Sequence, residues 1–349
     1  MKKTRLTIND IAKLANVSRS TVSRALNNNP EVSKETKERI QAVIEQYHYH
    51  PSTYARRMVT KSCDTIGLYI GERLKVHHAS AQVLQGVIEK STSENFDIII
   101  CGGKTEEQLV EMYQGGQVEG FIVLNPHANA RHQLSVLEQN SIPYICTAEC
   151  GTEGEFYCVD IDNEKASYDM MEYLLSLGHR KFAFVFEVGD TVESISYRFK
   201  GCKKKLAQCG IHVPEDHILR LDISNRKIPA EILQGWVSGP SPVTAIIALT
   251  DDLAMRVVDI LEKLRIRVPE DVSVVGFDDL TEILEGYPMT TIRQDFYQKG
   301  VVACEKMFDF IRNKTSLKKE WGILPYELII RESAGRIGSE NKDEKEECL

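Results

Sequence analysis

Hydrophobic residues at the start of the chain recur every three to four positions, which is the period of an amphipathic helix. Thr7 precedes an acid by three residues, as in a capping box. The apolar positions that follow it at helical spacing are Ile8, Ile11, Leu14 and Ala15. The pattern predicts a first helix that begins directly after Thr7.

Two further helices are predicted close behind. After a three-residue turn, Ser18 can cap the segment RSTVSRAL, in which Val22 and Leu26 share one face. Ser33 can cap a third helix. The apolar stripe of that helix would consist of Ile40, Val43, Ile44 and Tyr47. Three short helices around one core are about the least that folds within 50 residues, so we predict an all-α domain over 1–50.

Beyond residue 63 the pattern changes to short apolar runs that alternate with amphipathic stretches. Strands are expected at 65–70, 96–101, 120–125, 143–147, 181–186, 217–221, 244–249 and 271–277. Helices are expected at 81–93, 104–114, 130–140, 164–177, 196–209, 228–237 and 252–264. Apolar strands separated by helices predict parallel sheets covered on both faces, and two consecutive sets predict two doubly wound α/β lobes.

The predicted architecture indicates where a ligand would bind. Open α/β sheets bind ligands at the carboxyl ends of their strands, and a pocket between two lobes is the natural concave site. Neither a Walker loop nor a G-x-G-x-x-G sequence follows a strand, so no nucleotide-phosphate site is predicted.

Charge is divided unevenly along the chain. Residues 1–61 hold 12 Lys and Arg against 5 Asp and Glu, a net charge of +7, whereas the remaining residues hold 31 against 46. A basic head on an acidic body indicates that the head alone binds a polyanion. The alternative is an ordinary three-helix bundle with a solvated, charged face.

The second predicted helix would explain the basic head. In a helix-turn-helix, the N-terminal residues of the second helix contact base edges in the major groove. The candidates for base contacts are Arg19, Ser20 and Arg24. The candidates for phosphate contacts, which lie at helix ends, are Thr7, Ser18, Thr21 and Asn27.

Composition argues against several other classes of protein. The N-terminus lacks an apolar segment of signal-peptide length, and no apolar stretch approaches a membrane span, so we expect a cytoplasmic protein. Nine scattered cysteines indicate buried, reduced thiols rather than a disulfide framework. The closest cluster, Cys146, Cys150 and Cys158, lacks the spacing of a zinc site, so no metal is predicted.

Specific motifs resemble one family along nearly the whole chain. The head is similar to the DNA-binding domain of the lactose-repressor (LacI/GalR) family of bacterial transcription regulators, through TINDIAKLANVSRSTVSRALNNNPEVSKETKERI and YHYHPSTYARRM. The body resembles that family, in the same order, through TIGLYI, VEGFIVL, VDIDN, LGHRKFAFV, VPEDVSVVGFDD, MTTIRQDF and LPYELIIRESAG. The resemblance covers residues 4 to about 336.

The resemblance implies an effector-binding and dimerisation domain over 64–335 with the architecture of periplasmic sugar-binding proteins. Its first lobe would comprise about 64–160 and 293–322, and its second lobe about 163–290 and 325–335. The remaining segment, 336–349, is short, acidic and without a heptad repeat, so we expect it to be disordered and not to form a coiled coil.

The resemblance also implies effector-binding residues. Arg198 in SYRFKG and Asp278 in VVGFDD match the family residues that grip the effector. Gln294 and Phe296 in RQDF match positions that line the pocket from the first lobe. Paired hydrogen-bonding groups suit a polyhydroxylated sugar, and an arginine also suits a carboxylate or a phosphate.

The sequence departs from the family at three of the expected effector contacts. Thr250 stands where the family commonly has asparagine, and Ala148 followed by Glu149 stands where it often has aspartate. The loop GERLKVHHASAQ offers His78 and Ser80 in place of Asn-Pro-Phe. The fold is therefore more transferable than the identity of the effector.

Residues 51–63 are expected to form a hinge. Pro51 can open a short helix, but a segment this short is marginal alone. In the family, the matching segment folds on the operator and inserts a leucine into the minor groove, where this chain has Met58. Ala55 would permit close approach, and Arg56 would reach the groove or a phosphate.

These observations predict a transcription regulator, a repressor of sugar-utilisation genes that binds a palindromic operator as a homodimer. A small, galactoside-like sugar would release it. In the alternative, the effector has the opposite effect on operator affinity: a purine or a sugar phosphate tightens operator binding.

Two other classes of protein fit the sequence less well. A sugar-binding module without DNA function would need a secretion signal where the helix-turn-helix stands. An enzyme would need paired catalytic groups, but the neighbours in Asp251-Asp252 and in Asp278-Asp279 would point apart. We therefore expect neither an enzyme nor a cofactor, and no membrane partner.

Overall fold

Two compact units make up the chain, Met1–Cys63 and Asp64–Leu349. The computed structural model describes residues 6–26, 29–47, 63–70, 78–124, 130–148, 156–188, 193–222, 227–313 and 321–337. Five candidate site residues lie outside these ranges: Asn27, Ala55, Arg56, Met58 and Glu149. The predicted hinge helix therefore stays a prediction.

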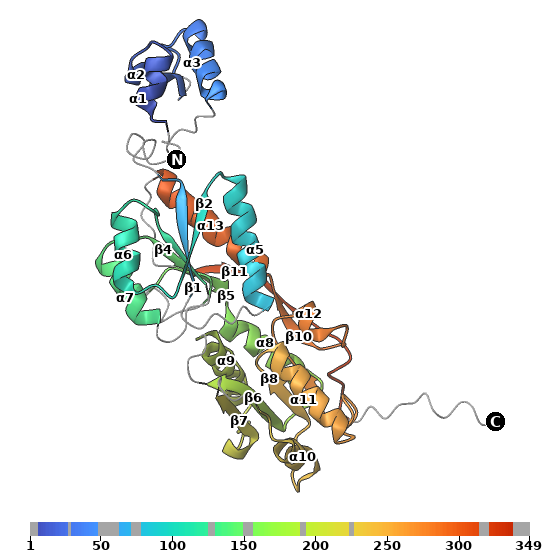
Figure 1. Ribbon diagram of the computed structural model, residues 1–349. Helices are drawn as coiled ribbons and strands as arrows, with labels where there is room; N and C mark the ends of the chain where they lie inside the picture. The colour runs from blue at the N-terminus through green and yellow to red at the C-terminus, as the bar shows by residue number, and fades with distance from the viewer. Residues whose placement is uncertain are drawn as a thin grey trace, which may run out of the picture. The chain divides into compact units, whose positions relative to one another are not determined.

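The first unit contains the three expected helices, α1 (Ile8–Leu14), α2 (Arg19–Leu26) and α3 (Lys34–Gln46) (Figure 1). They enclose one apolar core, to which the buried residues Ile11, Ala12, Ala15, Val22 and Ile40 contribute.

The helices of the first unit begin at the caps that the sequence predicts. At α1, the backbone N–H and the hydroxyl of Thr7 donate to the Asp10 carboxylate at 2.8 and 2.7 Å. At α2, the N–H of Thr21 donates to the Ser18 hydroxyl at 3.0 Å, and Ser33 caps α3 in the same way. These side chains satisfy N–H groups that have no partner within the helix.

Two predicted core positions of the first unit are wrong. Leu14 is 45% exposed and Tyr47 is 43% exposed. The buried stripe of α1 is centred between Ile11 and Ala12, so a residue three positions after Ile11 falls off its edge. Tyr47 follows the last residue of α3 and is its C-cap.

The first sheet of the second unit has six parallel strands in the order β11-β5-β4-β3-β1-β2. Its strands are β1 (Thr65–Ile70), β2 (Asp97–Gly102), β3 (Phe121–Leu124), β4 (Tyr144–Cys146), β5 (Cys158–Ile161) and β11 (Trp321–Leu324). Its helices are α5 (His78–Ser93), α6 (Glu106–Gln114), α7 (Ala130–Gln139) and α13 (Phe296–Asn313). Helices α5 and α13 cover one face and α6 and α7 the other, and a separate apolar cluster fills each side (Figure 1).

The second sheet has four parallel strands in the order β7-β6-β8-β9. Its strands are β6 (Phe182–Val188), β7 (Ile218–Asp222), β8 (Ala245–Ala248) and β9 (Ser273–Val275). The helical elements with it are α8 (Asn163–Ser176), α9 (Ser194–Gln208), η1 (Glu215–His217), α10 (Ala230–Ser238), α11 (Asp251–Lys263) and α12 (Thr281–Leu284).

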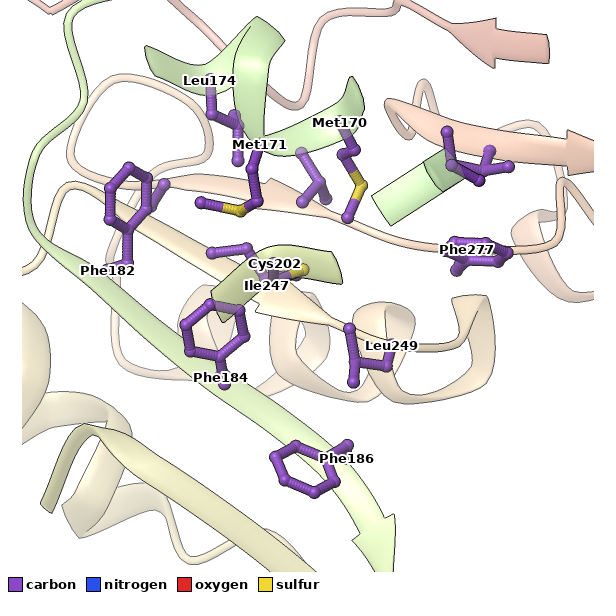
Figure 2. Close-up of a cluster of buried hydrophobic side chains, with 14 of the residues drawn as sticks. Met170, Met171, Leu174, Phe182, Phe184, Phe186, Cys202, Ile247, Leu249 and Phe277 are labelled. Atoms are coloured by element: carbon purple, nitrogen blue, oxygen red, sulfur yellow. The ribbon is translucent and has the colours of Figure 1, made fainter. Parts of the chain in front are cut away.

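Figure 2 shows one apolar layer of the second sheet. Met170, Met171 and Leu174 of α8 pack in one buried cluster with Phe182 and Phe184 of β6. Alternate residues of a strand point to the same face, so these two phenylalanines both face α8. The predicted strands and helices of both sheets agree with the observed elements to within a few residues.

One pair of strands departs from the prediction that all sheets are parallel. Strand β10 (Thr291–Gln294) pairs antiparallel with β12 (Tyr326–Ile329) in a separate two-stranded sheet. The physical reason is the path of the chain: β10 leads from the second sheet to α13 on the first, and β12 leads back from β11. Two segments that connect the same two sheets in opposite directions can pair only antiparallel.

The end of the domain also differs slightly from expectation. Ile337, which we expected in the disordered tail, donates its N–H to the Leu177 carbonyl at 3.1 Å. The tail itself, from residue 338 onward, lies outside the described residues.

Candidate functional site

Arg198 is the centre of a buried polar network in the second unit. Its Nε donates to Asn163 Oδ1 at 2.9 Å, and its Nη1 donates to the Leu249 carbonyl at 2.7 Å. Its Nη2 lies 3.1 Å from Asp278 Oδ1, and its guanidinium carbon lies 3.7 Å from the centroid of the Phe277 ring. Each nitrogen of the guanidinium therefore has a partner, and an aromatic ring supports its face.

The position of Asp278 follows from the sheet. Leu249 comes directly after β8, and Asp278 comes shortly after β9. Because β8 and β9 are neighbouring parallel strands, the two residues meet at the edge of the sheet where the strands end. Asp278 has a φ of 120°, which is rare for a residue with a side chain, and the N–H of Asp278 donates to the Ile292 carbonyl at 2.8 Å. A strained backbone of this kind persists only where the surroundings hold it in place, and it is common at ligand sites.

Gln294, at the end of β10, continues the network. Its Nε2 donates to Asp278 Oδ1 at 2.5 Å, and its Oε1 accepts from Lys299 Nζ at 2.6 Å. Lys299 also forms an ion pair with Asp160, and Asn163 Nδ2 donates to Asp160 Oδ2 at 3.2 Å. The hydrogen bonds thus close a ring. We call it the polar ring, with the members Asp160, Asn163, Arg198, Asp278, Gln294 and Lys299.

Every member of the polar ring is buried, with exposed fractions from 0% to 8%. Two cations, Arg198 and Lys299, balance two carboxylates, so the ring carries no net formal charge. Burial raises the pKa of Asp278, and the nearby Arg198 opposes that rise. Because a buried charge without its partner is costly, the members of the ring stabilise one another's ionised forms.

The polar ring joins segments of both sheets. Asp160 belongs to β5 of the first sheet and Asn163 begins α8 on the second, so this link lies where the chain first passes between the sheets. Gln294 and Lys299 lie at the second passage, on β10 and α13. A change in the ring therefore acts directly on the segments that connect the two sheets.

Asp251 fixes the turn that carries Asp278. Its carboxylate accepts from the Leu280 N–H at 2.9 Å and from the Thr291 hydroxyl at 2.7 Å. Burial raises the pKa of Asp251 to about 7, and the charge of Asp278 adds to the rise. The first residue of α11 thus ties the turn after β9 to β10.

The two adjacent aspartate pairs do point to different partners, as the sequence predicts. Asp252 pairs with Arg256, whereas Asp251 binds the turn. Asp279 Oδ2 lies 2.7 Å from Arg293 Nε, and Asp279 Oδ1 lies 2.7 Å from Arg331 Nη2. Asp278, in contrast, belongs to the polar ring. The close electrostatic pair is instead Asp251 and Asp278, one from each doublet, which only the fold brings together.

The remaining candidate effector residues lie outside the polar ring. Thr250 is the N-cap of α11, where its hydroxyl accepts from the Leu253 N–H at 3.4 Å. Phe296 is 8% exposed, and the centroid of its ring lies 4.9 Å from the Lys299 ammonium. His78 is exposed at the first residue of α5, and Ser80 is half-buried on the same helix. Their roles as effector contacts stay predictions.

Asp160, Asn163 and Lys299 are site residues that were not among those predicted from the sequence. For Lys299 a usable pattern exists in the sequence. It lies three residues after Phe296 on the stripe of α13 that is buried, a stripe that continues through Gly300, Ala303, Cys304, Met307 and Phe308. A lysine within an apolar stripe needs a buried partner, and that requirement marks it as unusual. The partner itself is distant in the sequence and could not be predicted.

The start of α2 presents the predicted DNA-contacting face of the first unit. Ser18, Arg19 and Ser20 are exposed there, and the Ser18 and Ser20 hydroxyls lie 2.7 Å apart. Arg24 is 59% exposed in its side chain and lies 3.6 Å from Glu31. An exposed ion pair of this kind contributes little, so Arg24 can exchange it for another acceptor at small cost.

The cysteines agree only in part with the prediction of buried thiols. Of those that the structure describes, Cys209 is exposed and the others are buried. Burial raises the pKa of the Cys101 thiol to about 11 and that of Cys304 to about 12. Among the residues within the described ranges, no group of His, Cys, Asp and Glu is arranged to hold a metal. No helix in the described part of the chain is long and apolar enough to cross a membrane.

Comparisons with known proteins match both units. Residues 7–52 match the model of bacterial regulatory proteins of the lacI family, and residues 171–334 match that of the periplasmic binding protein-like domain. Catabolite control protein A of Priestia megaterium is 27% identical over 335 residues, which is 94% of this chain and 99% of that protein.

Two solved structures extend the likeness. A complex of the transcriptional regulator CelR with cellobiose is 26% identical, covers 95% of this chain and all of that one, and has a TM-score of 0.66. The lac repressor dimer bound to operator and the anti-inducer ONPF covers the same shares at 23% identity with a TM-score of 0.79, which supports the fold.

Together, the helix-turn-helix unit and the two-sheet unit define a DNA-binding regulator with a periplasmic-binding-protein-like domain. The chain carries a DNA-binding domain of the lacI family followed by a periplasmic-binding-protein-like domain, and the relatives that it resembles along nearly its whole length are transcription regulators.

Proposed function

We propose that the protein is a cytoplasmic repressor of sugar-utilisation genes, which binds a palindromic operator as a homodimer and is released by a small sugar. The polar ring is the observation that carries this proposal, because it links Arg198 and Asp278 to the segments that join the two sheets. An effector that replaced hydrogen bonds of the ring would alter the connections between the two sheets. In a dimer, that change would alter how the two DNA-binding units are held.

The first unit supports the DNA-binding half of the proposal. It carries a net positive charge on an otherwise acidic chain, and Arg19, Ser20 and Arg24 are exposed on α2. An arginine can donate two hydrogen bonds to guanine, so Arg19 or Arg24 would specify bases while the hydroxyl groups bind phosphates. Two copies related by a two-fold axis would match the two halves of a palindrome.

The chemistry of the polar ring supports a sugar as the effector. Its side chains offer both hydrogen-bond donors and acceptors, and a sugar hydroxyl can serve as either. Each hydroxyl could replace one side-chain partner without leaving another buried group unpaired. Phe296 lies beside the ring and would cover an apolar face of the sugar.

The effector can weaken operator binding only if it binds one conformation more tightly than the other. We propose that the sugar favours the conformation with low operator affinity. The alternative, in which a purine or a sugar phosphate tightens operator binding, uses the same residues with the opposite sign.

Binding to a set of palindromic DNA duplexes at moderate salt tests the proposal, first without ligand and then with sugars, sugar phosphates and purines. We expect one palindrome to bind at least about 1,000-fold more tightly than random DNA and a neutral sugar to weaken that binding. Equal affinity for all duplexes would refute the repressor, and a ligand that tightens binding would establish the alternative.

A pair of variants separates base recognition from simple charge attraction. Arg19→Ala and Lys34→Ala each remove one positive charge from the first unit, but only Arg19 lies on the predicted base-contacting face. We expect Arg19→Ala to cost about 1–3 kcal/mol in specific binding and to relax base preference. Lys34→Ala should leave base preference unchanged, and equal effects of the two would argue against base contact by Arg19.

A further inference from the structure

Besides Arg198 and Asp278, the polar ring contains a second buried ion pair. Lys299 Nζ pairs with Asp160, and the two side chains are 3% and 1% exposed. Lys299 also donates to Gln294, which links this pair to Asp278. The second pair is therefore part of the same network as the proposed effector contacts.

Structural support alone does not explain this pair. Lys299 occupies a stripe of α13 whose other buried members are apolar or glycine, where an apolar side chain would pack without the cost of desolvating a charge. A buried ion pair is often no more stabilising than the apolar residues that could replace it. Its position, one hydrogen bond from Gln294 and two from Asp278, suggests a role in the site.

We infer that Asp160 and Lys299 determine the class of effector: together with Arg198 and Asp278 they form a charge-balanced site that accepts an uncharged polyhydroxylated ligand and rejects anions. This inference rests on the proposed function of the ring as the effector site. It assigns two residues to effector specificity, and it makes the sum of the four charges the property that selects the ligand.

The physical reason lies in what each kind of ligand must displace. An uncharged hydroxyl can take the place of one hydrogen bond and leave both ion pairs in contact. A carboxylate or phosphate must instead separate Arg198 from Asp278, or Lys299 from Asp160, and leave a buried carboxylate without its cation. The cost corresponds to a preference of roughly 100-fold for the neutral ligand.

The test compares matched ligands on the full-length protein. The probes are galactose, galacturonate and galactose 6-phosphate, and the corresponding three derivatives of glucose, with affinities measured by isothermal titration calorimetry. In the wild type we expect the neutral sugar of at least one series to bind roughly 100-fold more tightly than its anions.

Single substitutions should shift the preference in opposite directions. Asp160→Asn keeps an oxygen beside Lys299 but leaves the ring with one excess positive charge, so the preference for the neutral sugar should fall at least about tenfold. Lys299→Met leaves one excess negative charge and should weaken binding of the anions further. The double variant, Asp160→Asn with Lys299→Met, restores neutrality and should restore the preference.

The ratio of affinities distinguishes this role from a structural one, because a loss of folded protein changes all affinities alike. Glu94→Gln is the matched control: it neutralises an acid that pairs with Lys90 and Arg312 in the same unit, away from the ring. The ratio of neutral-sugar affinity to anion affinity in Glu94→Gln should equal that of the wild type. Thermal unfolding of each variant would verify that folded protein is compared, and the double variant supplies a second comparison if a single one does not fold.

The outcomes separate the two proposals. The neutral sugar could bind with the same ratio of neutral to anion affinity in the wild type, Asp160→Asn and the double variant. That result would overturn the charge-balance inference and leave the sugar-responsive repressor intact. Tighter binding of an anion by the wild type would overturn the inference as well. Failure of every probe to bind the wild type, with operator binding intact, would count against the proposed sugar effector and therefore against both.

Discussion

The two units use polar residues in opposite ways. In the first unit, the candidate DNA contacts Arg19, Ser20 and Arg24 are exposed on a surface helix, above a small core that is wholly apolar. In the second unit, the candidate effector contacts Arg198 and Asp278 are buried, and each already has a partner within the chain. An operator can therefore add its contacts to a surface that is already folded, whereas an effector must exchange its contacts with existing ones.

This difference has a consequence for regulation. Contacts added to an exposed surface change affinity without rearranging the protein, so the first unit suits recognition. Contacts exchanged within a buried network redistribute hydrogen bonds among the segments that hold it, so the second unit suits a response. Substitutions in each unit test whether its folding and binding depend on added or on exchanged contacts.

The largest effect should come from the centre of the polar ring. Arg198→Met removes one partner of the buried pair and leaves Asp278 without its cation, which should destabilise the second unit by about 3–5 kcal/mol and abolish the effector response. Urea unfolding and effector titration measure both. Lys204→Met removes a half-exposed cation from the same helix and should change stability by less than about 0.5 kcal/mol. Similar losses of stability in the two variants would show that the buried ion pair of the ring contributes no more to stability than an exposed one.

A somewhat smaller effect is expected in the first unit. Ile11→Ala empties part of its small core and should cost that unit about 3 kcal/mol, which would abolish operator binding while effector binding persists. Leu14→Ala on the same helix is the control and should cost less than about 0.5 kcal/mol, because Leu14 is largely exposed. If Ile11→Ala also removed effector binding, the two units would not be independent.

The third prediction concerns the pH dependence of the second unit. Asp251 has a pKa raised to about 7, so its contribution to stability is complete below its unfolded pKa and is lost as the pH rises through 7. Between pH 6 and pH 8, this loss should reduce the free energy of unfolding by about 1.4 kcal/mol. Asp251→Asn lacks the ionisable group. The difference in free energy of unfolding between wild type and variant should therefore change by about 1.4 kcal/mol between pH 6 and pH 8. A constant difference would show that Asp251 is ionised throughout this range.

The smallest effect concerns one helix cap. Ser33→Ala removes the hydroxyl that accepts the Thr36 N–H, and it should destabilise the first unit by about 1 kcal/mol without altering the effector response. Thermal unfolding of the first unit, followed by helical circular dichroism, would measure the change. An unchanged transition would mean that water replaces the cap at no cost.

The sequence determined the first unit almost completely, because its contacts are local. Caps three residues from their donors and apolar residues at helical spacing specify helices that need little information from elsewhere. The exceptions, Leu14 and Tyr47, lie at the edge of a stripe and at the end of a helix, where spacing alone does not decide burial. Most of the alternating strands and helices of the second unit were also visible, because parallel sheets require apolar runs of this length, but β5, β10, β11, β12 and α13 were not among the predicted elements.

Only the tertiary structure decided how the site is assembled. Asp160, Arg198 and Lys299 are far apart in the sequence, and no local pattern relates them. They belong to one ring only because the fold brings together β5, α8, α9, the turn after β9, β10 and α13. The same holds for Asp251, whose pKa is raised by burial and further by the charge of Asp278. It also holds for β10 and β12, whose antiparallel pairing follows from the passage of the chain between two sheets. The sequence by itself determined which elements form, since periodicity is a local property. The fold decided which buried charges meet, since a buried charge is stable only beside a partner that the whole chain must bring to it.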